Sequence, residues 1–279
     1  MPDRGMKRPG ENRADRPTLF TAHSDPVPYL HWRDGKASPA TKPMVLESAW
    51  TFSVNGEHWL TVLCTPAQMT YLALGFLYNE GLIAAPDDVA DLQVGPGADR
   101  VIRVELRDRS LRPPRRRTLT SGCGGGVTFV DLAATRESIR SSLRVTANQV
   151  LAALGRLQEA VRADHRRIGG FHTSGLSDGR ELLVVSMDIG RHNTLDRIAG
   201  ECLDRGIPMA DALLLTTGRV SAEMLGKAAR MQTPVIASVN SPTHLAVQLA
   251  HQWGITLVGY ARGSTLHIYT HPERILAPQ

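Results

Sequence analysis

"LLLTTGRVSAEMLGKAARMQTPVIASVNSPTHLAVQLAHQWGITLVGY", residues 213–260, contains three short apolar runs separated by two segments with helical spacing. The runs 213–215, 235–239 and 255–260 predict strands, and the segments 221–231 and 241–252 predict helices. Short, continuously apolar strands that alternate with helices of this length are typical of parallel strands buried on both faces. The stretch therefore predicts an α/β domain with a mixed, mostly parallel sheet.

The same domain extends in both directions, and we expect it to span residues 128–279. Upstream, a helix capped by Thr146 presents an apolar stripe, and a strand at 182–187 leads into a second helix that ends at Gly206. The stripe of the first helix consists of Val150, Leu154, Leu157 and Val161. Downstream, residues 265–269 predict an antiparallel edge strand.

The first part of the chain predicts a smaller α+β unit at residues 26–127. Residues 1–25 are rich in Pro, Arg and Asp, which predicts a disordered leader, and we expect ordered chain from about Met44. Two strands surround the turn signal Asn55-Gly56. A helix follows, with Thr65 as the expected N-cap and Gly81 as its end, and two more strands flank residues 95–97.

Composition limits the class of protein. The chain has 279 residues, 42% of them hydrophobic, and only three cysteines, Cys64, Cys123 and Cys202, which argues against a disulfide framework. It shows neither a secretory leader nor an apolar run of about 18 residues, so we expect a cytoplasmic protein that does not enter a membrane.

The net charge of +5 is concentrated in residues 107–117, which contain six Arg and one Asp. Aromatic residues make up only 5% of the chain and are not interleaved with these cations, as a nucleic-acid surface would require. We therefore expect a local anionic partner and no nucleic acid.

Cys123 lies in "TLTSGCGGG", residues 118–126, directly after the Arg-rich stretch. Glycine leaves the thiol sterically accessible, and neighbouring cations and backbone N–H groups favour the thiolate, which is the nucleophile. Cys123 is therefore our candidate nucleophile. The alternative is a Gly-rich hairpin with an incidental cysteine. Cys64 and Cys202 occupy apolar positions and are interpreted as core residues.

Four connections are expected at the carboxyl ends of the strands, where α/β sheets collect ligands: 188–193, 216–219, 240–243 and 260–265. Three of them contain an arginine, and all contain hydroxyl or small residues or both, which suits phosphate. None is a Walker A or G-x-G-x-x-G loop, so a P-loop NTPase and an ordinary dinucleotide dehydrogenase lose their main support. The arginines are Arg191, Arg219 and Arg262.

His192 follows Arg191 in the first of these connections and allows two interpretations. It could cap or pack against the following helix, or it could face a bound ligand together with Asp188. A third class of protein, a Cys–His hydrolase that uses Cys123 and His192, would need a rigidly held nucleophile, and the glycine-rich surroundings of Cys123 argue against it.

Long motifs in this sequence resemble the FdhD family of formate dehydrogenase accessory sulfurtransferases. They are "LTVLCTPAQMTYLALGFLYNEGLI", the Cys123 loop, "DIGRHNTLDRIAG", "TTGRVSAEMLGKAARMQTPVIASV", "NSPTHLAVQLA" and "TLVGYARGSTLHIYTHPERI", so the resemblance spans about residues 43–275. It implies a homodimer with a cytidine-deaminase-like C-terminal domain. It also implies transfer of persulfide sulfur from a cysteine desulfurase to the molybdenum bis(molybdopterin guanine dinucleotide) cofactor, which formate dehydrogenase requires.

The resemblance also implies roles for individual residues. Cys123 matches the persulfide cysteine, and Tyr260, Ala261, Arg262, Gly263, Ser264 and Thr265 match the cofactor-binding segment. The family's Asp-x-Gly-Arg-His-Asn stretch corresponds to residues 188–193. This stretch and the connection at 216–219 contain the remaining expected cofactor contacts. They are Asp188, Arg191, His192, Asn193, Thr217 and Arg219.

The chain departs from the family pattern at Gly126, where many members have the second cysteine of a Cys-x-x-Cys motif. It also lacks the H-x-E and P-C-x-x-C motifs of zinc deaminases, so we expect no metal site. The resemblance therefore implies a sulfurtransferase that works through a cysteine persulfide. The alternative is a non-catalytic chaperone that delivers the molybdenum cofactor to the apo-dehydrogenase.

Overall fold

The computed structural model describes residues 23–95, 99–113, 118–119, 127–128 and 137–276. Its α-helices are α1 (Met69–Asn79), α2 (Ala147–Ala160), α3 (Arg162–Arg167), α4 (Arg191–Arg205), α5 (Ala222–Arg230) and α6 (His244–Gln252). Two short 3-10 helices, η2 (Pro86–Asp88) and η4 (Pro272–Arg274), complete the described helical segments. No helix among the described residues is long and apolar enough to cross a membrane.

The central sheet has six strands in the order β11 (Leu182–Asp188), β10 (His172–Ser177), β12 (Leu213–Thr216), β13 (Val235–Ser238), β14 (Thr256–Arg262) and β15 (Thr265–Ile268). A second sheet has four strands in the order β4 (Glu57–Cys64), β3 (Ser48–Val54), β6 (Val101–Leu106) and β5 (Val89–Val94). Three two-stranded pairs are β1 (Ser24–Arg33) with β2 (Lys36–Val45), β7 (Thr118–Leu119) with β8 (Val127–Thr128), and β9 (Val145–Thr146) with β16 (Ile275–Leu276).

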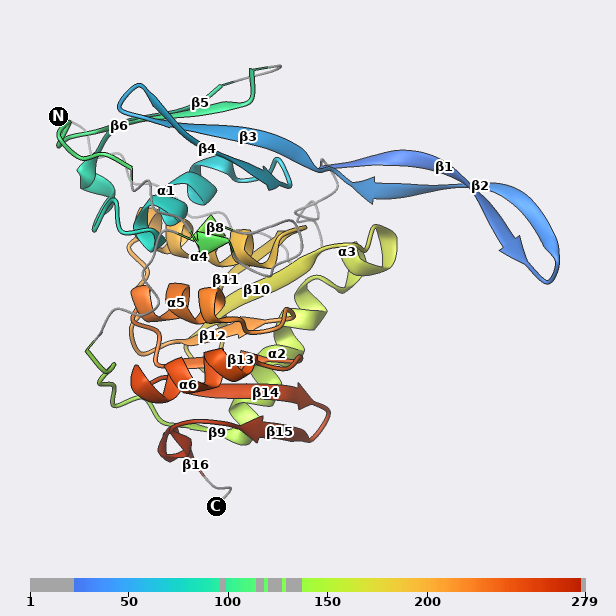
Figure 1. Ribbon diagram of the computed structural model, residues 1–279. Helices are drawn as coiled ribbons and strands as arrows, with labels where there is room; N and C mark the ends of the chain where they lie inside the picture. Colours follow the sequence, from blue (N-terminus) through green and yellow to red (C-terminus); the bar gives the residue numbers. More distant parts are fainter. Residues whose placement is uncertain (1–22, 96–98, 114–117, 120–126, 129–136, 277–279) are drawn as a thin grey trace, which may run out of the picture.

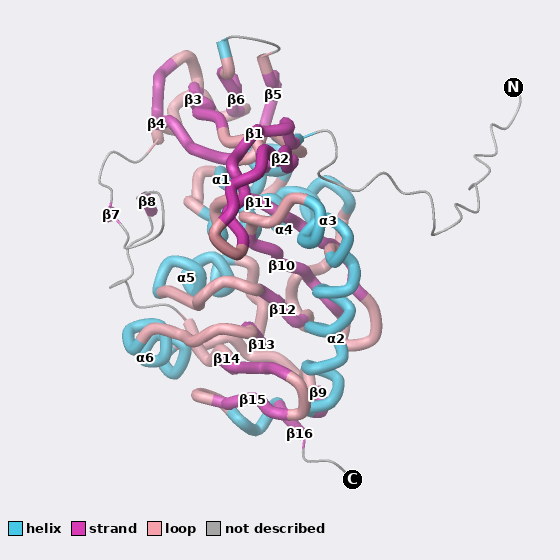
Figure 2. The backbone as a smooth tube through the Cα atoms, turned by 90° about the vertical axis from the view of Figure 1, so that its right-hand side faces the viewer, coloured by secondary structure: helices cyan, strands magenta, loops and turns pink. Residues whose placement is uncertain are grey.

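These elements stack in layers. Helix α2 covers one face of the six-stranded sheet, and α4, α5 and α6 cover the other (Figures 1 and 2). Helix α1 lies on α4, and the four-stranded sheet lies on α1 (Figure 1). The pair β1–β2 projects away from this stack as an arm (Figure 1). Helix α1 is thus the layer that joins the two sheets.

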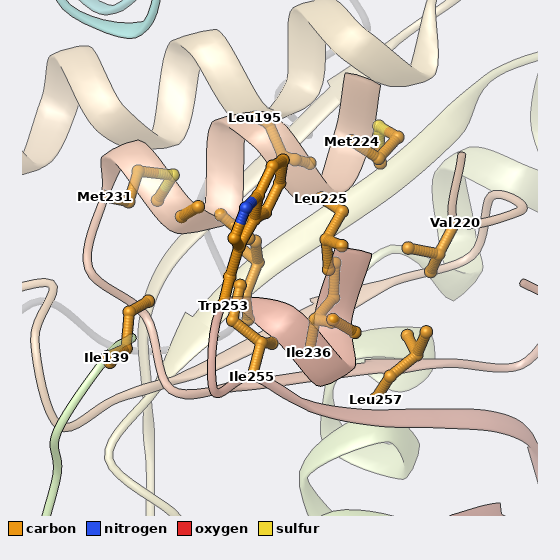
Figure 3. Packing of buried hydrophobic residues seen from close by; sticks show 14 of the residues in the cluster. Ile139, Leu195, Val220, Met224, Leu225, Met231, Ile236, Trp253, Ile255 and Leu257 are labelled. Carbon is orange, nitrogen blue, oxygen red and sulfur yellow. The ribbon is translucent and has the colours of Figure 1, made fainter. Parts of the chain in front are cut away.

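The strands of the central sheet are apolar throughout because each buries both faces. Leu214, Ile236 and Leu257 pack in one cluster with residues of α4, α5 and α6. Figure 3 shows Ile236 and Leu257 in this cluster together with Leu195 and Trp253. The alternate residues of the same strands pack against α2; they include Leu213, Leu215, Val235, Ala237 and Val258. Each large apolar side chain buried in this way stabilises the fold by roughly 1.5–3 kcal/mol.

The central sheet is mixed, as expected, but the prediction of mostly parallel pairing is wrong. Only β12–β13 and β13–β14 pair in parallel, whereas β10–β11, β10–β12 and β14–β15 are antiparallel. Strands β11, β12, β13 and β14 point the same way, but β10, which we did not predict, lies between β11 and β12. The βαβ pattern of the sequence specifies strand direction and does not reveal such an inserted neighbour. The predicted edge strand is confirmed as β15.

Three helix starts test the predicted caps. Thr146 caps α2 by accepting a hydrogen bond from Gln149 N, as expected. Helix α1 begins at Met69 after Gln68, whose φ of 47° is left-handed, so the predicted cap at Thr65 is wrong. Helix α6 begins at His244, and its cap is Thr243, later than the predicted start at Ser241.

Ordered chain begins well before Met44, since β1 starts at Ser24. We did not predict the β1–β2 pair because prolines and polar residues interrupt its apolar pattern. The rest of the predicted leader, residues 1–22, lies outside the described part of the chain.

Two glycines allow α1 and α4 to touch backbone to backbone. A Cβ on Gly75 of α1 would lie 1.7 Å from the carbonyl oxygen of Asp196, and one on Gly200 of α4 would lie 1.9 Å from that of Tyr71. No side chain larger than hydrogen fits at either position without moving a helix.

We expect Gly75→Ala to lower the free energy of unfolding by about 3 kcal/mol or more, because the methyl group must push α1 away from α4. The matched control is Gly155→Ala in the middle of α2, where a Cβ meets nothing within 4 Å. This control should raise stability by up to about 1 kcal/mol through helix propensity. Urea unfolding of both variants measures the difference, and equal stabilities would contradict the close contact.

Candidate functional site

The predicted connections at the carboxyl ends of the strands lie together. Asn240 Nδ2 donates to the carbonyl oxygen of Thr217 at 2.8 Å, which joins the connections after β12 and β13. Tyr260 N donates to Asn240 O at 3.1 Å, and Arg262 Nε donates to Val239 O at 2.8 Å, which joins β14 to them.

The connection from β11 to α4 meets the one after β12 at Gly218. A Cβ at Gly218 would lie 3.1 Å from Arg191 Cβ and Cδ and 3.6 Å from His172 Nδ1. The absence of a side chain at Gly218 thus leaves room for Arg191 and His172. All four connections therefore contribute to one site.

Arg191 is a buried cation that has no counter-ion among the residues that the structure describes. Its side chain occupies the first position of α4, the residue is 5% exposed, and its Nε is buried with no hydrogen-bond partner. Among the described residues it forms no ion pair, and Gly190, the N-cap of α4, has no side chain to satisfy the helix N-terminus. A buried, unpaired charge costs several kcal/mol, so the site as it stands is complementary to an anion.

Arg219 adds a second cation at the same place. It is exposed, and it is close enough to His172 to lower the pKa of that ring. One buried and one exposed arginine beside a helix N-terminus form a typical arrangement for phosphate.

His172 belongs to this site, although we did not predict it. It is the first residue of β10, and the beginning of an antiparallel strand lies beside the ends of its neighbours. Burial, and then the charge of Arg191, lower the pKa of His172, so the ring is neutral at pH 7. Only the assignment of β10 as a strand would have revealed this residue.

His192 is buried beside the start of α5. Its Nε2 forms a hydrogen bond of 3.3 Å with Ser221 Oγ and lies 3.2 Å from Glu223 Oε2. Burial, and then the charges of Lys227 and Arg191, lower the pKa of His192 to about 2, so the ring is neutral. These contacts match the packing interpretation better than the ligand-facing one.

Asp188, Asn193 and Thr217 are engaged within the protein. The carboxylate of Asp188 accepts hydrogen bonds from Thr65 N, Gly190 N, Asn193 Nδ2 and Arg197 Nη1. Asn193 Nδ2 also donates to Leu63 O, and Thr217 Oγ1 exchanges hydrogen bonds with the backbone of Thr173. These three side chains position the connections, and we leave Asp188 out of the proposed ligand contacts.

The segment 260–265 is a hairpin between β14 and β15 rather than a loop. Tyr260, Arg262, Gly263, Ser264 and Thr265 are exposed, whereas Ala261 is buried. Tyr260 has a left-handed φ of 50°, and its ring lies 5.2 Å from that of His267. The exposed residues are available to a ligand at the edge of the anion site.

Cys123 and the arginines at 115–117 lie outside the described residues. The described residues on either side of the Cys123 loop pair with one another, Thr118 with Thr128 and Leu119 with Val127. Cys64 and Cys202 are buried, and burial raises the pKa of each thiol to about 12, so neither is a thiolate at pH 7. Of the three cysteines, these two are inert core residues, as expected. No cluster of His, Cys, Asp and Glu suited to a metal occurs in the described part of the chain.

Comparison with known proteins identifies the family. Residues 45–276 match the model of the FdhD/NarQ family. The chain belongs to this family. It is 37% identical over 254 residues to the sulfur carrier protein FdhD of Staphylococcus aureus strain MRSA252, a match that covers 89% of this chain and 95% of the relative. The protein of strain Newman has the same identity and coverage.

A solved structure agrees with the fold. A crystal structure of a protein from Desulfotalea psychrophila, described as a formate dehydrogenase accessory protein, superposes with a TM-score of 0.75. The match covers 91% of this chain and all of that chain at 23% sequence identity. The FdhD/NarQ match includes every residue of the anion site. The cytidine-deaminase-like topology stays a prediction.

We expect Arg191→Met to raise the free energy of unfolding of the ligand-free protein by about 1–4 kcal/mol, because it removes an unpaired buried charge. The same variant should lose the stabilisation that inorganic pyrophosphate gives to the wild type. The matched control is Arg180→Met at the exposed β10–β11 turn, which should keep both properties of the wild type. Thermal unfolding with and without pyrophosphate tests this. Destabilised R191M that still responds to pyrophosphate would contradict the assignment.

The neutral state of His192 makes stability depend on pH. Between its pKa of about 2 in the folded protein and the ordinary value of 6.5, the unfolded chain binds a proton that the folded protein does not. The free energy of unfolding therefore falls as the pH drops below 6.5, and His192 contributes at most about 1.4 kcal/mol per pH unit. His192→Gln should show a shallower fall in urea unfolding between about pH 7 and pH 4. The same slope as in the wild type would show that the ring is protonated in the folded state.

Proposed function

We propose that this protein is a sulfur carrier, a sulfurtransferase that activates formate dehydrogenase. It takes sulfur from a cysteine desulfurase as a persulfide on Cys123 and passes it to the molybdenum bis(molybdopterin guanine dinucleotide) cofactor in the cytoplasm. The names of the relatives, sulfur carrier protein and formate dehydrogenase accessory protein, support the general role.

The observation that carries the proposal is the buried Arg191 at the N-terminus of α4, whose Nε has no hydrogen-bond partner and which forms no ion pair in the described part of the chain. A dinucleotide cofactor carries diphosphate groups, and a diphosphate placed there would pair with Arg191 and Arg219. Their positive charge favours binding because phosphate oxygens accept hydrogen bonds from guanidinium groups and from free helix N–H groups. The exposed residues of the 260–265 hairpin lie beside this position and would contact the rest of the nucleotide.

In the first step, the Cys123 thiolate attacks the outer sulfur of the desulfurase persulfide. A new S–S bond forms on Cys123, the S–S bond of the donor breaks, and its electron pair leaves with the donor cysteine as a thiolate. No net oxidation or reduction occurs in this step. The Arg-rich stretch 107–117 favours it electrostatically because it stabilises the attacking thiolate.

In the second step, the outer sulfur leaves Cys123 for the bound cofactor. The S–S bond of the persulfide breaks, and the outer sulfur leaves at the oxidation level of sulfide, which takes up two electrons. If the reduced cofactor supplies the two electrons, Cys123 is left as a thiolate. If a second thiol supplies them, that thiol and Cys123 are left joined in a disulfide. Because Gly126 replaces the second cysteine of the common Cys-x-x-Cys motif, that second thiol does not come from the same loop.

Incubation of the protein with cysteine and a cysteine desulfurase should add the mass of one sulfur atom, located on the peptide that contains Cys123. Cys123→Ala should show no adduct, whereas Cys202→Ala should keep it, because Cys202 is a buried thiol with a raised pKa. Mass spectrometry of the intact and digested protein measures both. An adduct on Cys123→Ala, or no adduct on the wild type, would refute the persulfide step.

The alternative function is a chaperone that delivers the same cofactor without transferring sulfur. Two observations favour it: Gly126 removes the neighbouring thiol, and the described residues by themselves form the anion site. Complementation of a strain that lacks this protein distinguishes the two functions. If the protein carries sulfur, the Cys123→Ser variant should fail to restore formate dehydrogenase activity in that strain. Full activity with Cys123→Ser would favour the chaperone.

A further inference from the structure

His172 shares one corner of the anion site with Arg191. The register of β10 against β12, in which Ser174 pairs with Thr216, places His172 opposite Gly218. A Cβ on Gly218 would lie 3.6 Å from His172 Nδ1 and 3.1 Å from Arg191 Cβ and Cδ. The imidazole ring and the stem of the arginine therefore flank the same glycine, and a ligand that reaches Arg191 also reaches the ring.

The protein itself makes no polar use of the His172 ring. In the described part of the chain, no hydrogen bond or ion pair engages this imidazole, and the residue is only half-buried. Two neighbouring histidines differ in this respect. His165 Nε2 lies 3.4 Å from Thr173 Oγ1, and His192 Nε2 lies 3.3 Å from Ser221 Oγ. The nitrogens of His172 are thus available to a ligand.

Four ionisable groups face the ring, each from a different segment. Arg191 begins α4, and Arg219 lies in the connection after β12. Asp188 ends β11 and is the register partner of His172, and His165 belongs to α3. Asp188 is the one anion among the four.

These surroundings keep the ring neutral in the ligand-free protein. Burial lowers the pKa of His172 most, and the charge of Arg191 lowers it next, with further contributions from Arg219 and His165. Asp188 raises the pKa of His172, but its carboxylate is already paired with Arg197 and offsets only part of the effect. A proton on His172 would add a third positive charge to a site that already holds two.

A diphosphate at the site reverses this balance. The proposed function places its negative charges between Arg191 and Arg219, where they compensate the two cations that disfavour an imidazolium. An opposite charge within about 4–6 Å favours the charged form of an ionisable group. A charged donor also makes a hydrogen bond to a phosphate oxygen that is roughly twice as strong as one from a neutral donor.

We propose that His172 is a third phosphate-binding residue of this site and that it binds the diphosphate as an imidazolium, taking up one proton as the ligand enters. The proton comes from the solvent and returns to it when the ligand leaves, so an N–H bond is the one bond that forms and breaks. The inference rests on the proposed function for its ligand, since it concerns the same diphosphate. It does not depend on Cys123 or on sulfur transfer.

Proton uptake makes the affinity depend on pH with a definite sign. The bound protein holds a proton that the free protein lacks, so binding strengthens as the pH falls through the neutral range, by at most about tenfold per pH unit. Once the free ring is also protonated, the affinity stops rising. A site that contains only the two arginines has no such dependence near neutral pH, because guanidinium groups stay charged.

Isothermal titration calorimetry with diguanosine diphosphate tests the proposal. In this probe a diphosphate bridges two guanosines and has no titratable proton near neutral pH, so any proton taken up goes to the protein. Titrations in MES and in imidazole buffer, which differ in ionisation enthalpy, give the number of protons bound. At about pH 6.5 the wild type should take up roughly half a proton or more per ligand.

His172→Gln should take up almost no proton and should bind the probe about tenfold more weakly at this pH, because it lacks the charged donor. The matched control is His251→Gln in the last turn of α6, an exposed position at the other end of the helix from the strand ends. The control should equal the wild type in affinity and in proton uptake. Urea unfolding confirms that both variants are folded.

The outcomes separate this inference from the proposed function. A wild type that binds the probe without a proton, or His172→Gln with the proton uptake of the wild type, would overturn the inference and leave the diphosphate site intact. A wild type that does not bind the probe would overturn the inference and the proposed cofactor site together.

Discussion

The contact between α1 and α4 is the constraint on which the rest of the structure depends. Gly75 and Gly200 bring the two helix backbones together, and two buried ionic groups hold them there. Arg197 of α4 pairs with Asp188 and donates to Thr65 O and Ala67 O just before α1. This contact unites the two sheets and fixes α4, whose N-terminus forms the anion site.

The second buried ionic group contains Lys227, which donates to both oxygens of Asp196 at 2.7 and 2.9 Å and approaches Glu80 at 3.5 Å. Burial alone would lower the pKa of Lys227, but the carboxylates of Asp196 and Glu80 outweigh it and raise the pKa above its usual value. Such pairs add little net stability, because desolvation cancels most of the attraction, but they penalise any other alignment of the helices. Arg191 differs from Lys227 and Arg197 because no described carboxylate pairs with its positive charge. Lys227 and Arg197, which join the layers, are paired with carboxylates, whereas Arg191 at the site has no ion pair with a described residue.

Much of the site could be inferred from the sequence because it lies at positions that follow from local pattern. Arg191, Arg219 and the 260–265 hairpin each come directly after an apolar strand, and the ends of strands that point the same way meet at one edge. His172 could not be found in this way, since it begins a strand that runs in the opposite direction. Nor could the sequence show that Asp188 accepts four hydrogen bonds, because one donor, Thr65 N, comes from a distant segment, and the others depend on how the following helix α4 lies against Asp188. The arm escaped detection because its prolines interrupt the alternation that identifies a strand.

The sequence by itself determined the helices α1, α2, α4, α5 and α6 and most strands of the two larger sheets, the inert character of Cys64 and Cys202, and the chemistry available at the strand ends. Apolar spacing and capping are properties of short windows of chain, so they can be read without a structure. Only the tertiary structure decided that β10 lies between β11 and β12, that α1 is enclosed between α4 and a sheet, and that the buried Arg191 side chain has no ion pair with a described residue. Each of these depends on which distant segments come into contact, and the balance of a buried charge is known only when all of its neighbours are known.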